Sequence, residues 1–202
     1  MVRTPTQAAI AAEGRGLLER RQVFRYAAGR VTVALARCPC VEVVALIGSV
    51  ARPLRREVPR LAPYRQLHLP IAHECKDVDL AAWVSRLDGL DELPRARGRT
   101  VGEIVADRGH GPAVYEIEVF LLESGNSHYL GQLCYFRRCP ADKRDCLATG
   151  CGRQPFLKQH DNFSFHLDAI AEGASVRLYD RLGGGIIGRA VDLPLIILDD
   201  DP

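Results

Sequence analysis

Residues 75–84 read CKDVDLAAWV and place two aspartates at the start of an otherwise apolar run. Side chains alternate along an extended strand, so Asp77 and Asp79 point the same way, with carboxylates roughly 6 to 7 Å apart. Two anions at that spacing repel each other unless a cation lies between them. The stretch therefore predicts a strand over residues 77–84 and a cation site where it begins.

Two further apolar runs predict neighbouring strands. Residues 41–49, VEVVALIGS, form a β-branched run that ends at a Gly-Ser pair. Residues 113–123, AVYEIEVFLLE, alternate over several positions, as a strand does. A strand that is apolar on both faces requires a layer on each side of the sheet.

Helical segments are expected around these strands. Residues 5–37 are rich in Ala, Leu, Arg and Glu, with three glycines that could interrupt the helix. A short helix is expected over residues 50–60, with Pro53 in its first turn, where the missing N–H does no harm. Residues 85–111 predict a helical segment that is broken at Pro94 and closed by a later glycine.

The order strand, helix, strand, helix, strand predicts an α/β (α+β) fold, with a small mixed sheet flanked by helices. We assign residues 1–123 to this core and residues 124–202 to a C-terminal region packed on it. That region contains a Cys-rich loop and a small β element. Its glycine run, residues 183–188, formally matches a dinucleotide fingerprint, but no helix follows, so a glycine-rich hairpin is expected.

Composition predicts a globular cytoplasmic protein that does not contact a membrane. The chain of 202 residues is 47% hydrophobic and 26% charged, and no apolar run approaches the roughly 18 residues of a membrane span. The only apolar core near the N-terminus, AAIAA, is too short for a secretory signal. The formal net charge of +2 does not by itself indicate a polyanionic partner.

The residues around the two aspartates are suited to phosphate and Mg²⁺. Gly48 would let the backbone approach a ligand closely, and Ser49 with the following N–H groups could hold a phosphate oxygen. Arg52, in the same segment, is a further candidate for contact with a nucleotide. Asp77 and Asp79 would coordinate Mg²⁺ through oxygen, the ligand atom that this ion prefers.

A third carboxylate is expected from residues 113–123, which contain Glu116 and Glu118 two positions apart. Glu118 is our first choice because four apolar residues follow it, and Glu116 is held in reserve. In the simplest structural alternative, Ser49 caps a helix and the acids line a solvated sheet edge. Acids at the mouths of buried strands are more typical of a site in an open α/β sheet.

These motifs together resemble the nucleotidyltransferase superfamily, which includes DNA polymerase β and the minimal nucleotidyltransferases. The resemblance rests on Gly48-Ser49 after a hydrophobic strand, on Asp77-Val78-Asp79-Leu80, and on the acidic third strand. It implies a polymerase β-like core in which the Gly-Ser pair contacts a nucleoside triphosphate and both aspartates bind metal ions. Glu118 would be the third acid and could take the proton of an attacking hydroxyl. The chain departs from the family pattern at Lys76, where a serine is common, and in its longer Gly-Ser to Asp interval.

The resemblance implies a Mg²⁺-dependent enzyme that transfers a nucleoside monophosphate from a nucleoside triphosphate, such as ATP, to an acceptor. The acceptor could be a small molecule, an RNA or a protein. The alternative is a catalytically degenerate, zinc-containing module of the same fold that binds nucleic acid or protein.

Four of the seven cysteines, Cys134, Cys139, Cys146 and Cys151, fall within eighteen residues. Their odd total and the lack of an export signal argue against a disulfide framework. Four thiolates satisfy tetrahedral Zn²⁺, so we expect a structural zinc site; an iron–sulfur cluster is the alternative, and His128 or His160 could replace one cysteine. Basic and aromatic side chains in residues 134–160 could hold single-stranded nucleic acid.

Overall fold

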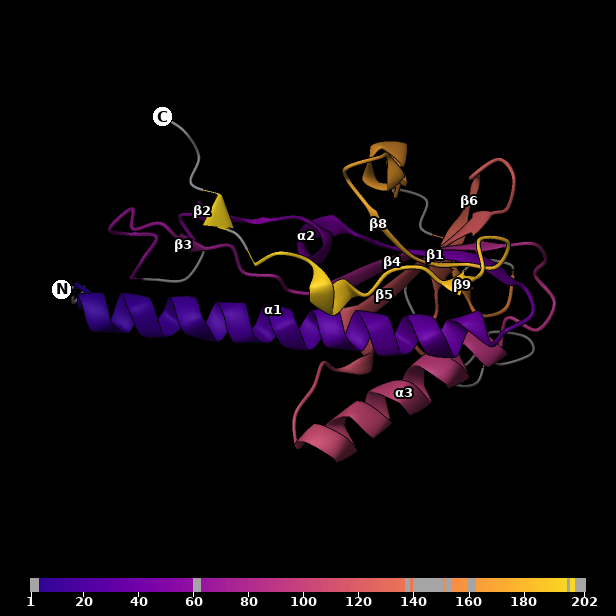
Figure 1. Cartoon of the computed structure of the whole chain (residues 1–202), viewed down its shortest axis with the longest axis horizontal. Coiled ribbons are helices and arrows are strands. Elements are labelled where there is room, and N and C mark those ends of the chain that lie inside the picture. The colour runs from indigo at the N-terminus through magenta and orange to yellow at the C-terminus, as the bar shows by residue number, and fades with distance from the viewer. Residues whose placement is uncertain are drawn as a thin grey trace.

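The protein, described by a computed structural model at residues 4–59, 63–136, 139, 151, 154–159, 163–195 and 197–198, is a mixed α+β structure. A seven-stranded sheet lies above two long helices, and a small three-stranded sheet lies beside it (Figure 1). The mixed α+β class is thus confirmed. A nucleotidyltransferase core and a zinc-binding loop stay predictions.

The large sheet has the spatial order β7-β6-β5-β4-β1-β8-β9. Its strands, in that order, are Leu157–Lys158, Tyr129–Leu133, Ile117–Glu123, Val78–Val84, Val41–Ile47, Val176–Asp180 and Gly185–Ile186. β4 and β5 run parallel, whereas the other neighbouring pairs are antiparallel. The three strands expected from the apolar runs form the centre of this sheet.

Two helices cover one face of the sheet. α1 (Gln7–Ala36) begins at Thr6, whose side-chain oxygen accepts a hydrogen bond from the Ala9 N–H at 3.2 Å. α3 (Glu92–Arg108) lies in the connection between β4 and β5, because two parallel strands need a long crossover that a hairpin turn cannot provide. It ends at Gly109, which adopts the left-handed backbone at φ 73°. The described residues also contain three short 3₁₀ turns: η1 (Val114–Glu116), η2 (Leu167–Ile170) and η3 (Ala190–Asp192).

The two faces of the central strands differ. On β4, Val78, Leu80, Ala82 and Val84 pack into the core between the sheet and the helices α1 and α3. The alternate residue Ala81 packs on the opposite face in a smaller cluster with Ile47, Phe120 and Leu122. Residue 79 and, by the same alternation on β5, residue 118 therefore face away from the two helices.

The expected helix over residues 50–60 is wrong. α2 covers only Gly48–Ala51, and β2 (Leu54–Glu57) follows it directly. Arg52, which precedes Pro53, is extended at φ −91° and ψ 162°, as the residue before proline prefers. β2 pairs with β3 (Ile71–Ala72) and β10 (Ile197–Leu198) in the small sheet.

Three further features of the helices and strands differ from expectation. The glycines in α1 do not interrupt it, because tertiary packing outweighs a cost of about 1 kcal/mol each. Pro94 does not break α3, because it lies in the first turn, where no intrahelical partner for its N–H is lost. The third central strand begins at Ile117 rather than at residue 113, because η1 precedes it.

The chain after residue 123 adds strands to both edges of the large sheet. β6 and β7 extend it past β5, and β8 and β9 extend it past β1. β8 and β9 pair antiparallel, with Tyr179 opposite Ile186, so the expected glycine-rich hairpin is confirmed. In the part of the chain that the structure describes, no helix combines the length and apolar character that crossing a membrane requires.

Arg97 is buried in the core between α3 and the sheet. Its side chain is 1% exposed and donates hydrogen bonds to the carbonyls of Ile117 at 3.1 Å and Cys134 at 2.7 Å. Burial lowers the pKa of this guanidinium to about 10. Arg97 thereby ties the beginning of β5 to the chain that follows β6.

We predict that Arg97→Ala lowers the free energy of unfolding by about 2 to 5 kcal/mol, because it leaves two buried carbonyls unpaired and a cavity. Urea unfolding followed by circular dichroism measures the loss. Arg95→Ala is the matched control, since Arg95 is exposed on the same helix and pairs with Asp91 at 2.8 Å. Its loss should stay below about 1 kcal/mol, and equal losses in the two variants would contradict the assignment.

Candidate metal centre

Three carboxylates converge at one end of the parallel pair of strands. Asp77 immediately precedes β4, Asp79 is its second residue, and Glu118 lies directly opposite Asp79 on β5. One oxygen from each of the three side chains lies within 4.8 Å of the others. The structure therefore brings together the three acids that the sequence singled out.

The electrostatics of this acidic trio are unfavourable without a counter-charge. Burial, followed by the charges of Asp77 and Glu118, raises the pKa of Asp79 to about 7. Three carboxylates held this close together offer the hard oxygen ligands that Mg²⁺ and Mn²⁺ take, so the residues fit a divalent cation.

Gly48 makes room for the Asp79 carboxylate. It directly follows Ile47, which pairs with Asp79 across β1 and β4, and its φ of 70° is in the left-handed region. A Cβ atom at position 48 would lie inside van der Waals contact with Asp79 Oδ2 and only 3.3 Å from its Cγ. The sequence suggested that this glycine admits a ligand; the structure shows that it first admits an acid of the trio.

Ser49 and Arg52, the other expected nucleotide contacts, flank the same turn. Ser49 lies in α2, half-buried, and Arg52 follows that helix as an exposed residue. The position before α2 belongs to Ile47, which forms no side-chain cap. The alternative in which Ser49 caps a helix is therefore not what the structure contains, and a phosphate contact by either residue stays a prediction.

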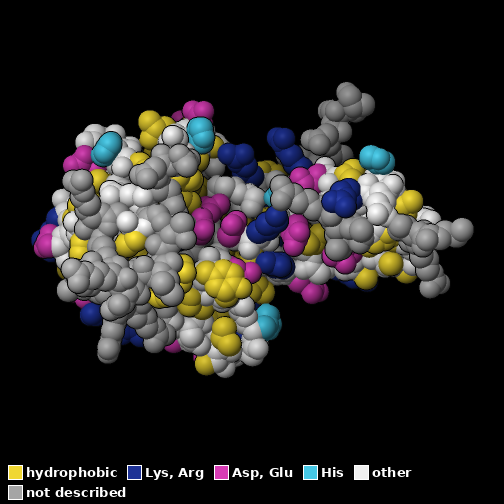
Figure 2. All heavy atoms as spheres, turned by 180° about the vertical axis from the view of Figure 1, so that it is seen from behind, with side chains coloured by type: hydrophobic (Ala, Val, Ile, Leu, Met, Phe, Trp, Pro, Cys, Tyr) yellow, Lys and Arg dark blue, Asp and Glu magenta, His cyan; other side chains and the backbone are white. Residues whose placement is uncertain are grey.

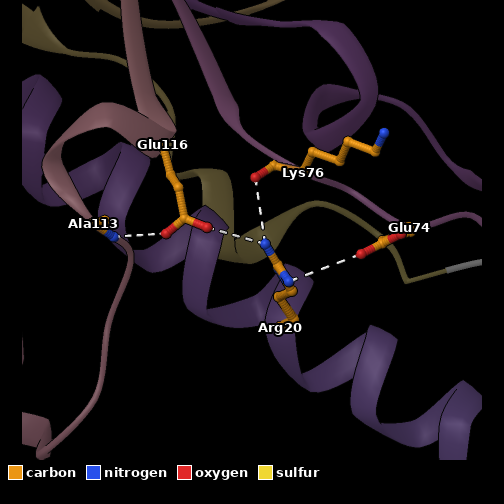
Figure 3. A network of polar contacts seen from close by, with 5 residues as sticks. All are labelled: Arg20, Glu74, Lys76, Ala113 and Glu116. Atoms are coloured by element: carbon orange, nitrogen blue, oxygen red, sulfur yellow. Dashed lines mark hydrogen bonds and ion pairs between the residues drawn. The ribbon is translucent and has the colours of Figure 1, made fainter.

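Glu116, the reserve candidate for the third acid, is held elsewhere. It accepts hydrogen bonds from the Ala113 N–H at 2.6 Å and from Arg20 of α1 at 3.0 Å (Figure 3). The same guanidinium donates to the Lys76 carbonyl at 3.4 Å and lies 4.0 Å from Glu74. Arg20 therefore joins the chain just before Asp77 to the chain just before Glu118, and nothing in the sequence pattern pointed to it.

Two buried arginines of α1 form hydrogen bonds to the chain just after the Gly-Ser pair. Arg21 and Arg25 are 1% and 2% exposed, and both donate to the carbonyl of Val50 in α2, at 3.5 and 3.3 Å. Arg25 also donates to the Leu193 carbonyl at 2.6 Å. Burial lowers the pKa of both guanidinium groups, that of Arg25 to about 10.

The predicted zinc site lies partly outside the described residues, because Cys146 and His160 are not among them. Cys134 is buried, whereas Cys139 and Cys151 are half-buried. Within the described residues, the acidic trio is the only group of three or more candidate ligands found close together. Zinc binding by Cys134, Cys139, Cys146 and Cys151 therefore stays a prediction.

Charges of both signs gather on one face of the molecule. Figure 2 shows acidic side chains near the middle of the face seen from behind, with Lys and Arg side chains beside them. Such a surface suits a metal ion together with an anionic group that the ion would bridge. No family model, curated protein or solved structure matches this chain.

We predict that Gly48→Ala weakens Mg²⁺ or Mn²⁺ binding by about 10- to 100-fold, because the added methyl group displaces Asp79 from the trio. Strain at a positive φ should also lower the free energy of unfolding by about 1 to 3 kcal/mol. Calorimetric metal titration and thermal unfolding measure both effects. Gly14→Ala, in an open part of α1 with no atom within 4 Å, is the control and should leave metal affinity unchanged. Wild-type metal affinity in Gly48→Ala would refute this role of the glycine.

Asp79 should contribute a loss of stability to the metal-free protein as pH rises from about 4 to about 7. The pKa of Asp79 is about 7 in the fold against 3.8 ordinarily, so the folded state binds the extra proton over that interval. Urea unfolding midpoints in chelator, measured across that range and above it, test the slope. Asp79→Asn should flatten the curve, and Mg²⁺ should restore stability above pH 7. A wild-type slope that survives in Asp79→Asn would assign the effect to other groups.

Proposed function

We propose that this protein is a Mg²⁺-dependent nucleotidyltransferase that transfers a nucleoside monophosphate from a nucleoside triphosphate to an acceptor. The observation that carries the proposal is the convergence of Asp77, Asp79 and Glu118 beside the Gly48 turn. The resemblance drawn from the sequence assigned the same residues to metal and nucleotide. The mixed sheet with helices on one face agrees with the expected type of core.

In this proposal each residue has a separate role. Asp77, Asp79 and Glu118 hold Mg²⁺, which would neutralise charge that develops on the phosphates during transfer. The backbone at Gly48 and Ser49 contacts the phosphates, and the exposed Arg52 adds positive charge. Since Arg20 fixes the chain before two of the acids, it acts as a positioning residue.

The reaction is a substitution at the α-phosphorus. An acceptor oxygen forms a bond to that phosphorus, and the bond from the phosphorus to the bridging oxygen breaks to release pyrophosphate. The acceptor proton passes to a carboxylate, for which Glu118 is the candidate. Positioning and electrostatic stabilisation supply most of the rate enhancement in such transfers.

The second candidate is a catalytically degenerate binding module of the same fold. It is favoured by Lys76 before the first aspartate and by a surface pair in which Lys158 lies 5.1 Å from the centre of the Tyr135 ring. Cationic and aromatic side chains of this kind bind single-stranded nucleic acid without catalysis. This module would show salt-dependent binding to RNA or DNA and no metal-dependent binding of a nucleoside triphosphate.

Calorimetric titration of the four nucleoside triphosphates with Mg²⁺ decides between these functions. We expect binding that requires Mg²⁺ and weakens by more than about tenfold in Asp77→Asn/Asp79→Asn, because the double variant lacks two of the three charges. Asp88→Asn is the matched control, since Asp88 is exposed and pairs with Arg86 at 3.3 Å. A folded wild type that binds none of the four triphosphates with Mg²⁺ would reject the enzyme in favour of the binding module.

A further inference from the structure

Four aromatic rings gather on the sheet face that carries the acidic trio. Phe120 and Phe163 stack with centroids 5.8 Å apart and planes at 12°, and Tyr129 and Phe165 stack at 5.4 Å and 14°. The remaining cross-contacts between the two stacks span 5.5 to 6.5 Å. The rings therefore form one connected aromatic cluster made of β5, β6 and the chain before η2.

The aromatic cluster adjoins the acids along β5. Phe120 follows Glu118 by two residues, so both side chains point to the same face roughly 7 Å apart. Burial, followed by the negative charge of Glu118, raises the pKa of Tyr129 to about 12. The Tyr129 hydroxyl is buried and has no hydrogen-bond partner among the described residues. A polar site and an apolar aromatic surface thus adjoin each other along β5, where Phe120 follows Glu118.

Within the aromatic cluster, Phe163 differs from its neighbours in exposure. Phe120 is 8% exposed, and Tyr129 and Phe165 pack partly buried against the small core on this face. Phe163 stacks on Phe120 and yet keeps 41% of its surface exposed. A ring that is rigidly backed by a buried ring and open to solvent loses little conformational freedom when a planar ligand stacks on it.

We propose that Phe163, backed by Phe120, is the stacking platform for a nucleobase of a nucleotide substrate that binds at the acidic trio. The proposal rests on the proposed function and adds the recognition of the base. A nucleotide has the matching chemistry, because one end is anionic and suits a carboxylate-held cation while the other end is a planar ring. The base belongs either to the nucleoside triphosphate or to the end of a single-stranded acceptor.

The test compares ligands with and without a base. Mg²⁺-dependent binding of each nucleoside triphosphate is measured by calorimetry against inorganic tripolyphosphate, which keeps the phosphates and lacks the base. The second arm compares a short single-stranded oligonucleotide with an abasic oligonucleotide of the same length. Base–aromatic stacking should make the base-containing ligand bind about 5- to 150-fold more tightly than its base-free counterpart.

Phe163→Leu keeps an apolar side chain and removes the ring. It should abolish the tighter binding of base-containing ligands while leaving the affinity for tripolyphosphate unchanged. Phe163→Tyr should restore the tighter binding. Tyr115→Leu is the control, because Tyr115 is an exposed aromatic residue, at 70%, that lies outside the aromatic cluster. If only the oligonucleotide arm weakens, the platform stands and the base is that of the acceptor.

Two results would overturn the platform alone. One is a wild type that binds tripolyphosphate as tightly as every base-containing ligand, and the other is a base advantage that persists in Phe163→Leu in both arms. Failure of the proposed function is recognised separately. In that case, tripolyphosphate and the triphosphates both fail to bind in the presence of Mg²⁺, and the platform falls with the site on which it rests.

Discussion

The centre of the structure depends on one strand pairing, which brings three mutually repelling carboxylates together. Parallel pairing of β4 and β5 sets Asp79 opposite Glu118, and α3 provides the long connection that a parallel pair requires. Gly48 leaves the space that the Asp79 carboxylate occupies. The raised pKa of Asp79 records the cost of this arrangement in the absence of a cation. Such a cost is typical of functional sites, where charge is held ready for a ligand at the expense of stability.

The middle of α1 supplies the side chains that hold the surrounding chain in place. Arg20 ties together the segments that lead into β4 and β5. Arg21 and Arg25 bind the carbonyl of Val50, and Arg25 also holds the segment at residues 193–194. The acids are thus placed by strands and fixed by a helix, which gives more precise positioning than a site built on loops. These supporting groups do not contact the trio themselves.

The sequence predicted what is local and missed what depends on tertiary contact. β1, β4 and the choice of Glu118 followed from apolar runs, alternation and the spacing of two acids, all of which act over a few residues. The role of Arg20 could not be predicted, since its partners lie 56 and 96 residues away and an arginine on a helix is ordinarily a solvated residue. The helix expected over residues 50–60 does not form because Pro53 favours an extended backbone at Arg52, from which the chain enters β2.

The length of α1 fixes the distance between the two sheets. Its first half packs on β3 of the small sheet, and its second half packs beneath the large one (Figure 1). Each helical residue advances the axis by about 1.5 Å and turns it by about 100°. A one-residue insertion near the middle of α1 would therefore turn the apolar side of one half away from its sheet while the other half stayed in place. We therefore expect the fold to tolerate substitutions along the exposed side of this helix better than changes in its residue count.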